Sequence, residues 1–224
     1  MKKQLFLFAT LVIIATAFSY GQSIKDTVVD IDGNIYHTVK IGTQTWMVEN
    51  LKVTHYRNGD SIPNMRDYKS WNFSTTGAYS NYNNDPIEAK IYGKLYNWHA
   101  VNDNRAIAPK GWHVSTYADW TMLTKFLGGN KKKVGGNLKE TTSLHWINPN
   151  KKASNSCGFL ALPGGYRFYN GKFGFIGESG AWWTATEYDT TEAWSICIRN
   201  TDSEIIELMG VKANGFSVRC VKDN

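Results

Sequence analysis

The chain has 224 residues, a formal net charge of +6, and an unusual share of aromatic and glycine residues: nine Trp, twelve Tyr, ten Phe and 20 Gly. The charge is too mild to indicate a nucleic-acid partner, and we interpret the lysine clusters at 131–133 and 151–152 as solvated loop tips. After the first 20 residues no run approaches 18 apolar residues, which excludes a later transmembrane helix and predicts a soluble mature protein.

Residues 1–21 predict a secretory signal peptide. Lys2 and Lys3 precede an apolar stretch, Leu5–Ala17, and the small residues Ser19 and Gly21 indicate cleavage after residue 21. An N-terminal membrane anchor and an earlier cleavage after residue 17 are the alternatives. We therefore expect a secreted protein located at the cell surface or in the periplasm.

The mature chain, residues 22–224, predicts one domain. It contains no Pro/Ser-rich linker, no low-complexity tract and no internal repeat, and its length is ample for a single core. Loss of the two lysines of the signal peptide lowers the formal charge from +6 to +4. Many short strands joined by tight turns, with large rings between them, explain the abundance of glycine and aromatic residues.

The N-terminal third predicts a β-hairpin followed by loops. Asp32-Gly33 is a tight-turn signal, and residues 35–41 alternate between apolar and polar side chains as a half-buried strand does. Residues 44–50 continue as another short strand. Residues 55–90 are polar, irregular and rich in Asn and Tyr, so we expect long loops there.

The segment "PKGWHVSTYADW" predicts a corner at which a strand leads into a helix. Thr116 is a good N-cap, and Asp119 three residues later completes a capping box. Trp120 then begins an apolar helical stripe that Gly128-Gly129 ends. His113 lies before the helix with no acid or cysteine at the spacing of a nucleophile and its base. We therefore expect a structural role for His113, with Trp112 and Trp120 in the core.

The C-terminal third predicts five short strands within about 65 residues, joined by hairpins such as Asn170-Gly171 and by the turn at 199–202. Because the strands are consecutive, an antiparallel sheet is the natural arrangement. In the last strand Phe216, Val218 and Cys220 alternate with polar neighbours, so we expect one apolar face and a second face that carries Arg219. The fold class predicted from these elements is α+β, with one or two helices and long loops.

The three cysteines, Cys157, Cys197 and Cys220, enter an oxidising compartment if the chain is secreted. We expect Cys197 and Cys220 to lie in two strands of one sheet and to form a disulfide. The alternative is that all three are small buried apolar residues.

Six ordered motifs resemble one known family. "DIDGNIYHTVKIGTQTWMVENL", "YGKLYNWHAV", "PKGWHVSTYADWTML", "CGFLALPGGYRFYNGKF", "AWWTATE" and "GFSVRCVKD" together look like the Fibrobacter succinogenes major paralogous domain. The resemblance implies a secreted or surface protein of Gram-negative type without an established common activity. It also implies a C-type-lectin-like fold, related at fold level to formylglycine-generating enzymes, and fold similarity alone carries no function.

We expect a non-catalytic binding module that recognises carbohydrate or a surface protein through exposed aromatic side chains. Aromatic rings pack against the CH groups of a sugar, and nearby polar groups orient it. The candidate ligand-binding residues are Trp182, Trp183, Tyr188 and Trp194, with Arg167 and Arg199 as charged partners. Because neighbours on a strand point to opposite faces, one of Trp182 and Trp183 is expected in the core.

Two other functions stay open. One is a structural or adhesive component of the cell envelope. The other is an enzyme related to formylglycine-generating enzymes, whose chemistry needs reactive thiols that bind copper; Cys197 and Cys220 are the conceivable pair. The sequence contains neither G-x-S-x-G nor H-E-x-x-H, so we expect no catalytic residues, no metal and no cofactor.

Overall fold

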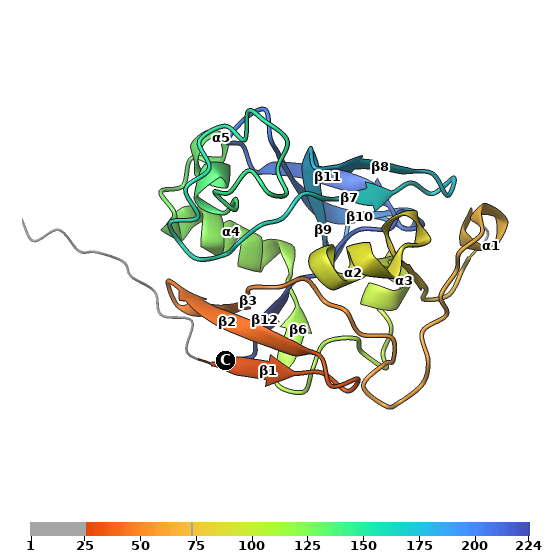
Figure 1. Ribbon diagram of the computed structural model, residues 1–224. Coiled ribbons are helices and arrows are strands. Elements are labelled where there is room, and N and C mark those ends of the chain that lie inside the picture. The colour runs from red at the N-terminus through yellow and green to blue at the C-terminus, as the bar shows by residue number, and fades with distance from the viewer. Residues whose placement is uncertain (1–25, 73) are drawn as a thin grey trace, which may run out of the picture.

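The computed structural model describes residues 26–224 except residue 73; the predicted signal peptide lies outside the described residues. Two five-stranded sheets and a two-stranded sheet form the β-structure, and short helices and long connections lie around them (Figure 1). The α+β class predicted from the sequence is confirmed. Within the described part of the chain, no helix combines the length and apolar character needed to cross a membrane.

The first sheet has the strand order β1-β2-β3-β12-β6 and is antiparallel throughout. The predicted hairpin is confirmed: β1 pairs with β2 around the turn at Asp32-Gly33, where Gly33 has a φ of +81°. The strand bounds are β1 (Thr27–Val29), β2 (Ile35–Ile41), β3 (Gln44–Met47), β6 (Trp112–Val114) and β12 (Cys220–Lys222).

The second sheet has the order β11-β10-β9-β7-β8. Its strands are β7 (Gly164–Arg167), β8 (Phe173–Ile176), β9 (Ser179–Glu187), β10 (Glu192–Arg199) and β11 (Ile206–Val211). The hairpin predicted at Asn170-Gly171 joins β7 to β8, and the turn at 199–202 joins β10 to β11. Two details differ from the prediction. Strand β7 runs parallel to β9, and the last strand, β12, leaves this sheet to pair with β3 and β6 in the first.

The helices are more numerous than the one or two expected. They are α1 (Tyr68–Asn72), α2 (Pro86–Tyr92), α3 (Trp98–Val101), α4 (Tyr117–Phe126) and α5 (Lys131–Val134), with 3-10 turns at Tyr82–Asn84 and Gly135–Asn137. Residues 55–90, which were expected to be only loop, thus contain α1, the start of α2 and strand β4 (Tyr79–Ser80), which pairs with β5 (Leu95–Tyr96) just beyond this region. Asp85 caps α2 by accepting from the Ile87 amide, a local signal that the polar composition of the region obscured.

The predicted corner is confirmed. Strand β6 leads into α4 through a capping box, in which the Thr116 side chain accepts from the Asp119 amide and the Asp119 carboxylate accepts from the Thr116 amide. Trp112 and Trp120 are both buried, as expected. This corner places the first turn of α4 beside strand β12 and the end of the chain.

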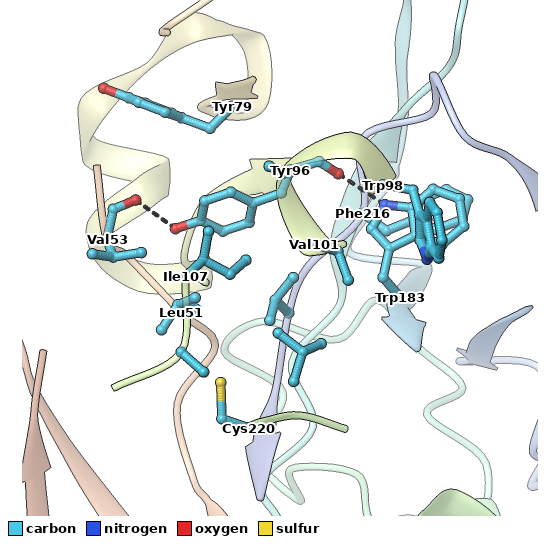
Figure 2. Close-up of a cluster of buried hydrophobic side chains, with 14 of the residues drawn as sticks. Leu51, Val53, Tyr79, Tyr96, Trp98, Val101, Ile107, Trp183, Phe216 and Cys220 are labelled. Carbon is cyan, nitrogen blue, oxygen red and sulfur yellow. Dashed lines mark hydrogen bonds between the residues drawn. The ribbon is translucent and has the colours of Figure 1, made fainter. Parts of the chain in front are cut away.

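Two apolar clusters form the core, and the strands contribute alternate residues to them. Met47, Cys220 and Trp183 belong to one cluster, whereas their chain neighbours Trp46, Val221 and Trp182 belong to the other. Figure 2 shows part of the first cluster, in which the Tyr96 hydroxyl donates to the Val53 carbonyl at 2.7 Å and the Trp183 indole donates to the Tyr96 carbonyl at 2.8 Å. Because both faces of β9 are covered, neighbouring large rings are buried on opposite sides.

Lys139, Arg167 and Arg219 are buried in the fold, and each donates hydrogen bonds to backbone carbonyl groups. The Lys139 ammonium donates to the carbonyls of Lys151, Arg199 and Asp202 at 2.7–3.1 Å, and burial lowers its pKa to about 8. Arg167 donates to the carbonyls of residues 65–67 and 171, and its guanidinium lies 4.4 Å from the ring centre of Trp71. These contacts hold long connections against the sheets.

Arg219 corrects the expectation of a polar outer face on the last strand, because it is 1 % exposed. Its guanidinium donates to Asn50 Oδ1 at 2.7 and 3.0 Å, to the Phe159 carbonyl at 2.7 Å and to the Met47 carbonyl at 3.3 Å. The face of the last strand that was expected to be polar therefore packs into the second apolar cluster, and the Arg219 guanidinium on this face bonds to internal acceptors.

Candidate functional site

Trp182 and Trp183 are not ligand-binding residues. Each is 0 % exposed, and each indole N–H bonds internally, Trp182 to Asn50 Oδ1 and Trp183 to the Tyr96 carbonyl, both at 2.8 Å. The expectation that they point to opposite faces holds, but the second face is covered by the rest of the fold. Alternation along a strand separates the two rings without leaving either of them in solvent.

The two candidate arginines are also in the wrong environments to assist the aromatic residues. Arg167 is 1 % exposed and all its contacts described above are internal. Arg199 is exposed, but it lies at the far end of β10 from Trp194 and pairs with Asp202 at 3.0 Å. Neither arginine joins a common site with Trp194.

Tyr188 and Trp194, in contrast, lie together at the surface. Their ring centres are 5.2 Å apart with the planes nearly perpendicular, and Tyr117 from the start of α4 also contacts Trp194, with ring centres 4.8 Å apart. Met209 pairs with Trp194 across β10 and β11 and is 46 % exposed. Tyr188 is 50 % exposed and Trp194 is half-buried. We call these four residues the Trp194 surface.

Polar groups flank this apolar surface. The Tyr117 hydroxyl donates to Glu207 Oε2 at 2.8 Å, and the Lys131 ammonium lies 2.6 Å from the same oxygen. The hydrogen bond from Tyr117 to Glu207 raises the tyrosine pKa, and the contact with Glu207 raises the pKa of Lys131. A carboxylate and an ammonium held beside aromatic rings are able to accept and donate hydrogen bonds to hydroxyl groups of a ligand.

The turn that carries Tyr188 is fixed by its own hydrogen bonds. Asp189 Oδ1 accepts from the amides of Thr191 and Glu192 at 2.7 and 2.8 Å, and the Tyr188 amide donates to the Glu192 carbonyl. Lys212 donates to the Thr190 carbonyl at 2.9 Å and pairs with Glu187. A surface ordered before binding loses less conformational entropy when a ligand binds.

His113 has two acidic partners that local spacing did not reveal. Its Nδ1 lies 2.7 Å from Asp223 at the end of the chain, and its Nε2 lies 3.2 Å from Asp119 of the capping box. Both contacts raise the pKa of His113. Burial opposes ionisation of Asp119, but its hydrogen bonds with His113 and Thr116 lower its pKa to about 2. His113 thus connects a carboxylate of α4 with a carboxylate that follows the last strand. This is in line with the structural role expected for this residue.

The expected disulfide between Cys197 and Cys220 is not present. All three cysteines are free and buried, and Cys197 lies in β10 of the second sheet whereas Cys220 lies in β12 of the first. Burial raises the pKa of Cys157 and Cys197 to about 11 and raises that of Cys220 further. Across residues 26–224 without 73, no three His, Cys, Asp or Glu side chains gather as a metal site would require.

Comparison with known proteins identifies the family. A family model described as the Fibrobacter succinogenes major domain matches residues 39–222, which is most of the chain, so the chain belongs to this family. The resemblance inferred from the six motifs is thereby confirmed. No curated protein and no solved structure matches the chain.

Proposed function

We propose that this member of the Fibrobacter succinogenes major domain family is a secreted, non-catalytic module that binds carbohydrate at the Trp194 surface. The observation that carries the proposal is the contact of Tyr117, Trp194 and Tyr188 at the surface, with Glu207 and Lys131 hydrogen-bonded at their side. A pyranose presents CH groups to such rings, while its hydroxyl groups reach the carboxylate and the ammonium.

The scaffold we propose for this site is C-type-lectin-like. Long connections, an α+β composition and a last strand that returns to the N-terminal sheet support this assignment. Residues 1–21 support export, since their composition is that of a signal peptide. Export in turn gives a glycan-binding module access to extracellular or periplasmic ligands.

The proposal is tested by a glycan array followed by calorimetry on each glycan that binds. We expect Tyr188→Ala and Trp194→Ala to weaken binding about tenfold, the equivalent of about 1.4 kcal/mol, because an aromatic contact contributes about that amount. Tyr169→Ala is the matched control, since Tyr169 is also 50 % exposed but lies outside the Trp194 surface. EDTA should leave the affinity unchanged. Absence of binding to every glycan, or equal affinities for all three variants, would remove the proposal.

A structural or adhesive role is the second candidate, and strand β11 favours it. This strand lies at the edge of the second sheet and exposes Leu208, Met209 and Val211. Exposed apolar edge strands readily pair with other chains. Labelling of intact cells with a membrane-impermeant reagent separates a surface component, which would be labelled, from a periplasmic binder, which would not.

Chemistry like that of formylglycine-generating enzymes has little support. Such chemistry needs accessible thiolates, whereas burial raises the pKa values of Cys197 and Cys220 and holds both as thiols at neutral pH. Their positions in separate sheets also argue against a shared copper ion.

A further inference from the structure

The two lysine clusters of the sequence, at 131–133 and 151–152, lie at one corner of the fold. The Ser154 amide donates to the Gly136 carbonyl at 2.9 Å, which ties the second cluster to the turn after α5. The Ile205 amide donates to the Lys131 carbonyl at 2.8 Å, which ties α5 to the segment before β11. These segments are therefore neighbours beside α5 (Figure 1), and we call residues 131–140, 150–154 and 199–207 the basic corner.

Lys139 joins the same segments from inside the fold. It is 0 % exposed, and its ammonium donates to the carbonyls of Lys151, Arg199 and Asp202. These bonds hold the second lysine cluster against the turn between β10 and β11. Because a charge in a low-dielectric interior is screened less than a charge at the surface, Lys139 also adds to the positive potential of the basic corner.

Most carboxylates of the basic corner already have partners. Glu207 pairs with Lys131, Asp202 with Arg199 and Glu140 with His145, which leaves Glu204 and the neighbouring Glu178. The ammonium groups that pair with no carboxylate of the described residues are those of Lys132, Lys133, Lys139, Lys151 and Lys152. Residues 1–25 and 73, which the structure does not describe, contain no Asp or Glu that could neutralise them. The corner therefore keeps an excess of positive charge, and four of these five lysines are exposed.

The basic corner borders the Trp194 surface. Glu207 Oε2 accepts from the hydroxyl of Tyr117, which belongs to that surface, and lies 2.6 Å from Lys131 Nζ. Across the β10–β11 ladder Glu207 lies opposite Ile196, two residues along β10 from Trp194. At about 3.4 Å per residue, the corner begins roughly 7 Å from Trp194. One sugar chain can therefore contact both the aromatic rings and the lysines.

We propose that the ligand of the Trp194 surface is an anionic polysaccharide, whose carboxylate or sulfate groups bind the exposed lysines of the basic corner. This inference rests on the carbohydrate-binding function proposed above. Uncharged faces of the sugar rings pack against Trp194, as in that proposal. Asp189 and Glu192 place negative charge at the other end of the surface, near Tyr188. Because like charges repel, the acidic groups of the ligand are directed toward the corner.

The test compares matched polymers in calorimetry with the full chain. Polygalacturonate and its methyl ester differ in the carboxylate charge, and dextran sulfate and dextran differ in the sulfate charge. Because charge attraction depends little on sugar identity, at least one charged polymer should bind, and more tightly than its uncharged partner. Raising NaCl from about 50 to about 500 mM should weaken this binding at least about tenfold, because salt screens exposed charges. Binding of neither charged polymer, or equal binding of an uncharged partner, overturns the inference. Equally tight binding of double-stranded DNA would mark a general polyanion surface and would also overturn it.

Two double variants each remove the charge of one cluster: Lys132→Gln with Lys133→Gln, and Lys151→Gln with Lys152→Gln. Each should weaken binding of the charged polymer about three- to tenfold at low salt, as the loss of two exposed ion pairs predicts. The matched control is Lys110→Gln with Lys222→Gln, which removes the same charge from exposed lysines outside the corner and should leave the affinity unchanged. All four lysines are exposed, so cooperative unfolding should be retained. Equal affinities in the two cluster variants and the control refute the basic corner as a binding surface.

Trp194→Ala separates this inference from the proposed function. We expect it to weaken binding of the charged polymer as the cluster variants do. If glycans bind and only Trp194→Ala weakens them, the carbohydrate function stands and the anionic ligand is wrong. If only the cluster variants weaken binding, the corner binds anions and the carbohydrate site at the Trp194 surface is wrong.

Discussion

Replacement of Arg219 by methionine tests whether a buried cation bonded by carbonyl groups stabilises this fold. The change removes two backbone contacts, to the carbonyls of Phe159 and Met47, and two contacts to Asn50 Oδ1. Asn50 Oδ1 keeps the Trp182 indole as a donor at 2.8 Å. The carbonyls of Phe159 and Met47 are therefore the acceptors most affected, because each loses its hydrogen bond from Arg219.

The magnitude follows from these contacts. A buried acceptor left without a donor costs about 1–3 kcal/mol, so two give about 2–6 kcal/mol. Release of the guanidinium from burial offsets part of this loss, because charge desolvation alone amounts to several kcal/mol. We expect Arg219→Met to lower the free energy of unfolding by about 2–3 kcal/mol, and the melting temperature by about 5–10 °C in a domain of this size.

Urea denaturation followed by far-UV circular dichroism measures the effect, with Arg199→Met as the control. Arg199 is exposed and pairs only with Asp202 in the described contacts, so its loss should change the free energy of unfolding by less than about 0.5 kcal/mol. If Arg219→Met is as stable as the parent chain or more stable, the desolvation penalty outweighs the hydrogen bonds and the reasoning is wrong.

Three further predictions concern the core, the histidine contact and the thiols. Trp183→Ala should lower the free energy of unfolding by about 3–5 kcal/mol in urea denaturation, whereas Trp194→Ala at the surface should lower it far less; equal losses would contradict the burial difference. The folded-state pKa of His113 is raised, so the protonated ring stabilises the folded chain. This stabilisation is fully present below a pH of about 6.5 and is lost as the pH rises through the folded-state pKa. The stability difference between the parent chain and His113→Gln, about 0.5–1 kcal/mol at pH 5.5 for such an exposed pair, should therefore shrink at pH 8.5, and a difference that grows with pH would refute this assignment. In Ellman's assay the folded chain should show no rapidly reacting thiol and the chain in urea should show three, a result that a disulfide between two of the cysteines would reduce to one.

Local features of the chain were predictable because their causes are local. The hairpin at Asp32-Gly33 and the capping box of Thr116 and Asp119 depend on residues at most a few positions apart, and both are present. Of the six candidate residues, Tyr188 and Trp194 do lie together, because Tyr188 follows β9 in the turn that leads into β10, and β10 carries Trp194. Tyr117 was missed, because it reaches Trp194 from a helix 77 positions earlier.

The sequence alone determined the α+β class, the family, the two hairpins and the corner between β6 and α4, since turn, cap and alternation signals act between near neighbours. Only the tertiary structure decided which face of each strand meets solvent, because that depends on what distant segments cover it. Return of the last strand to the first sheet buries Arg219 and places Cys220 and Cys197 in separate sheets. The same long-range packing covers both faces of β9, which removes Trp182 and Trp183 from the surface and leaves Trp194 there.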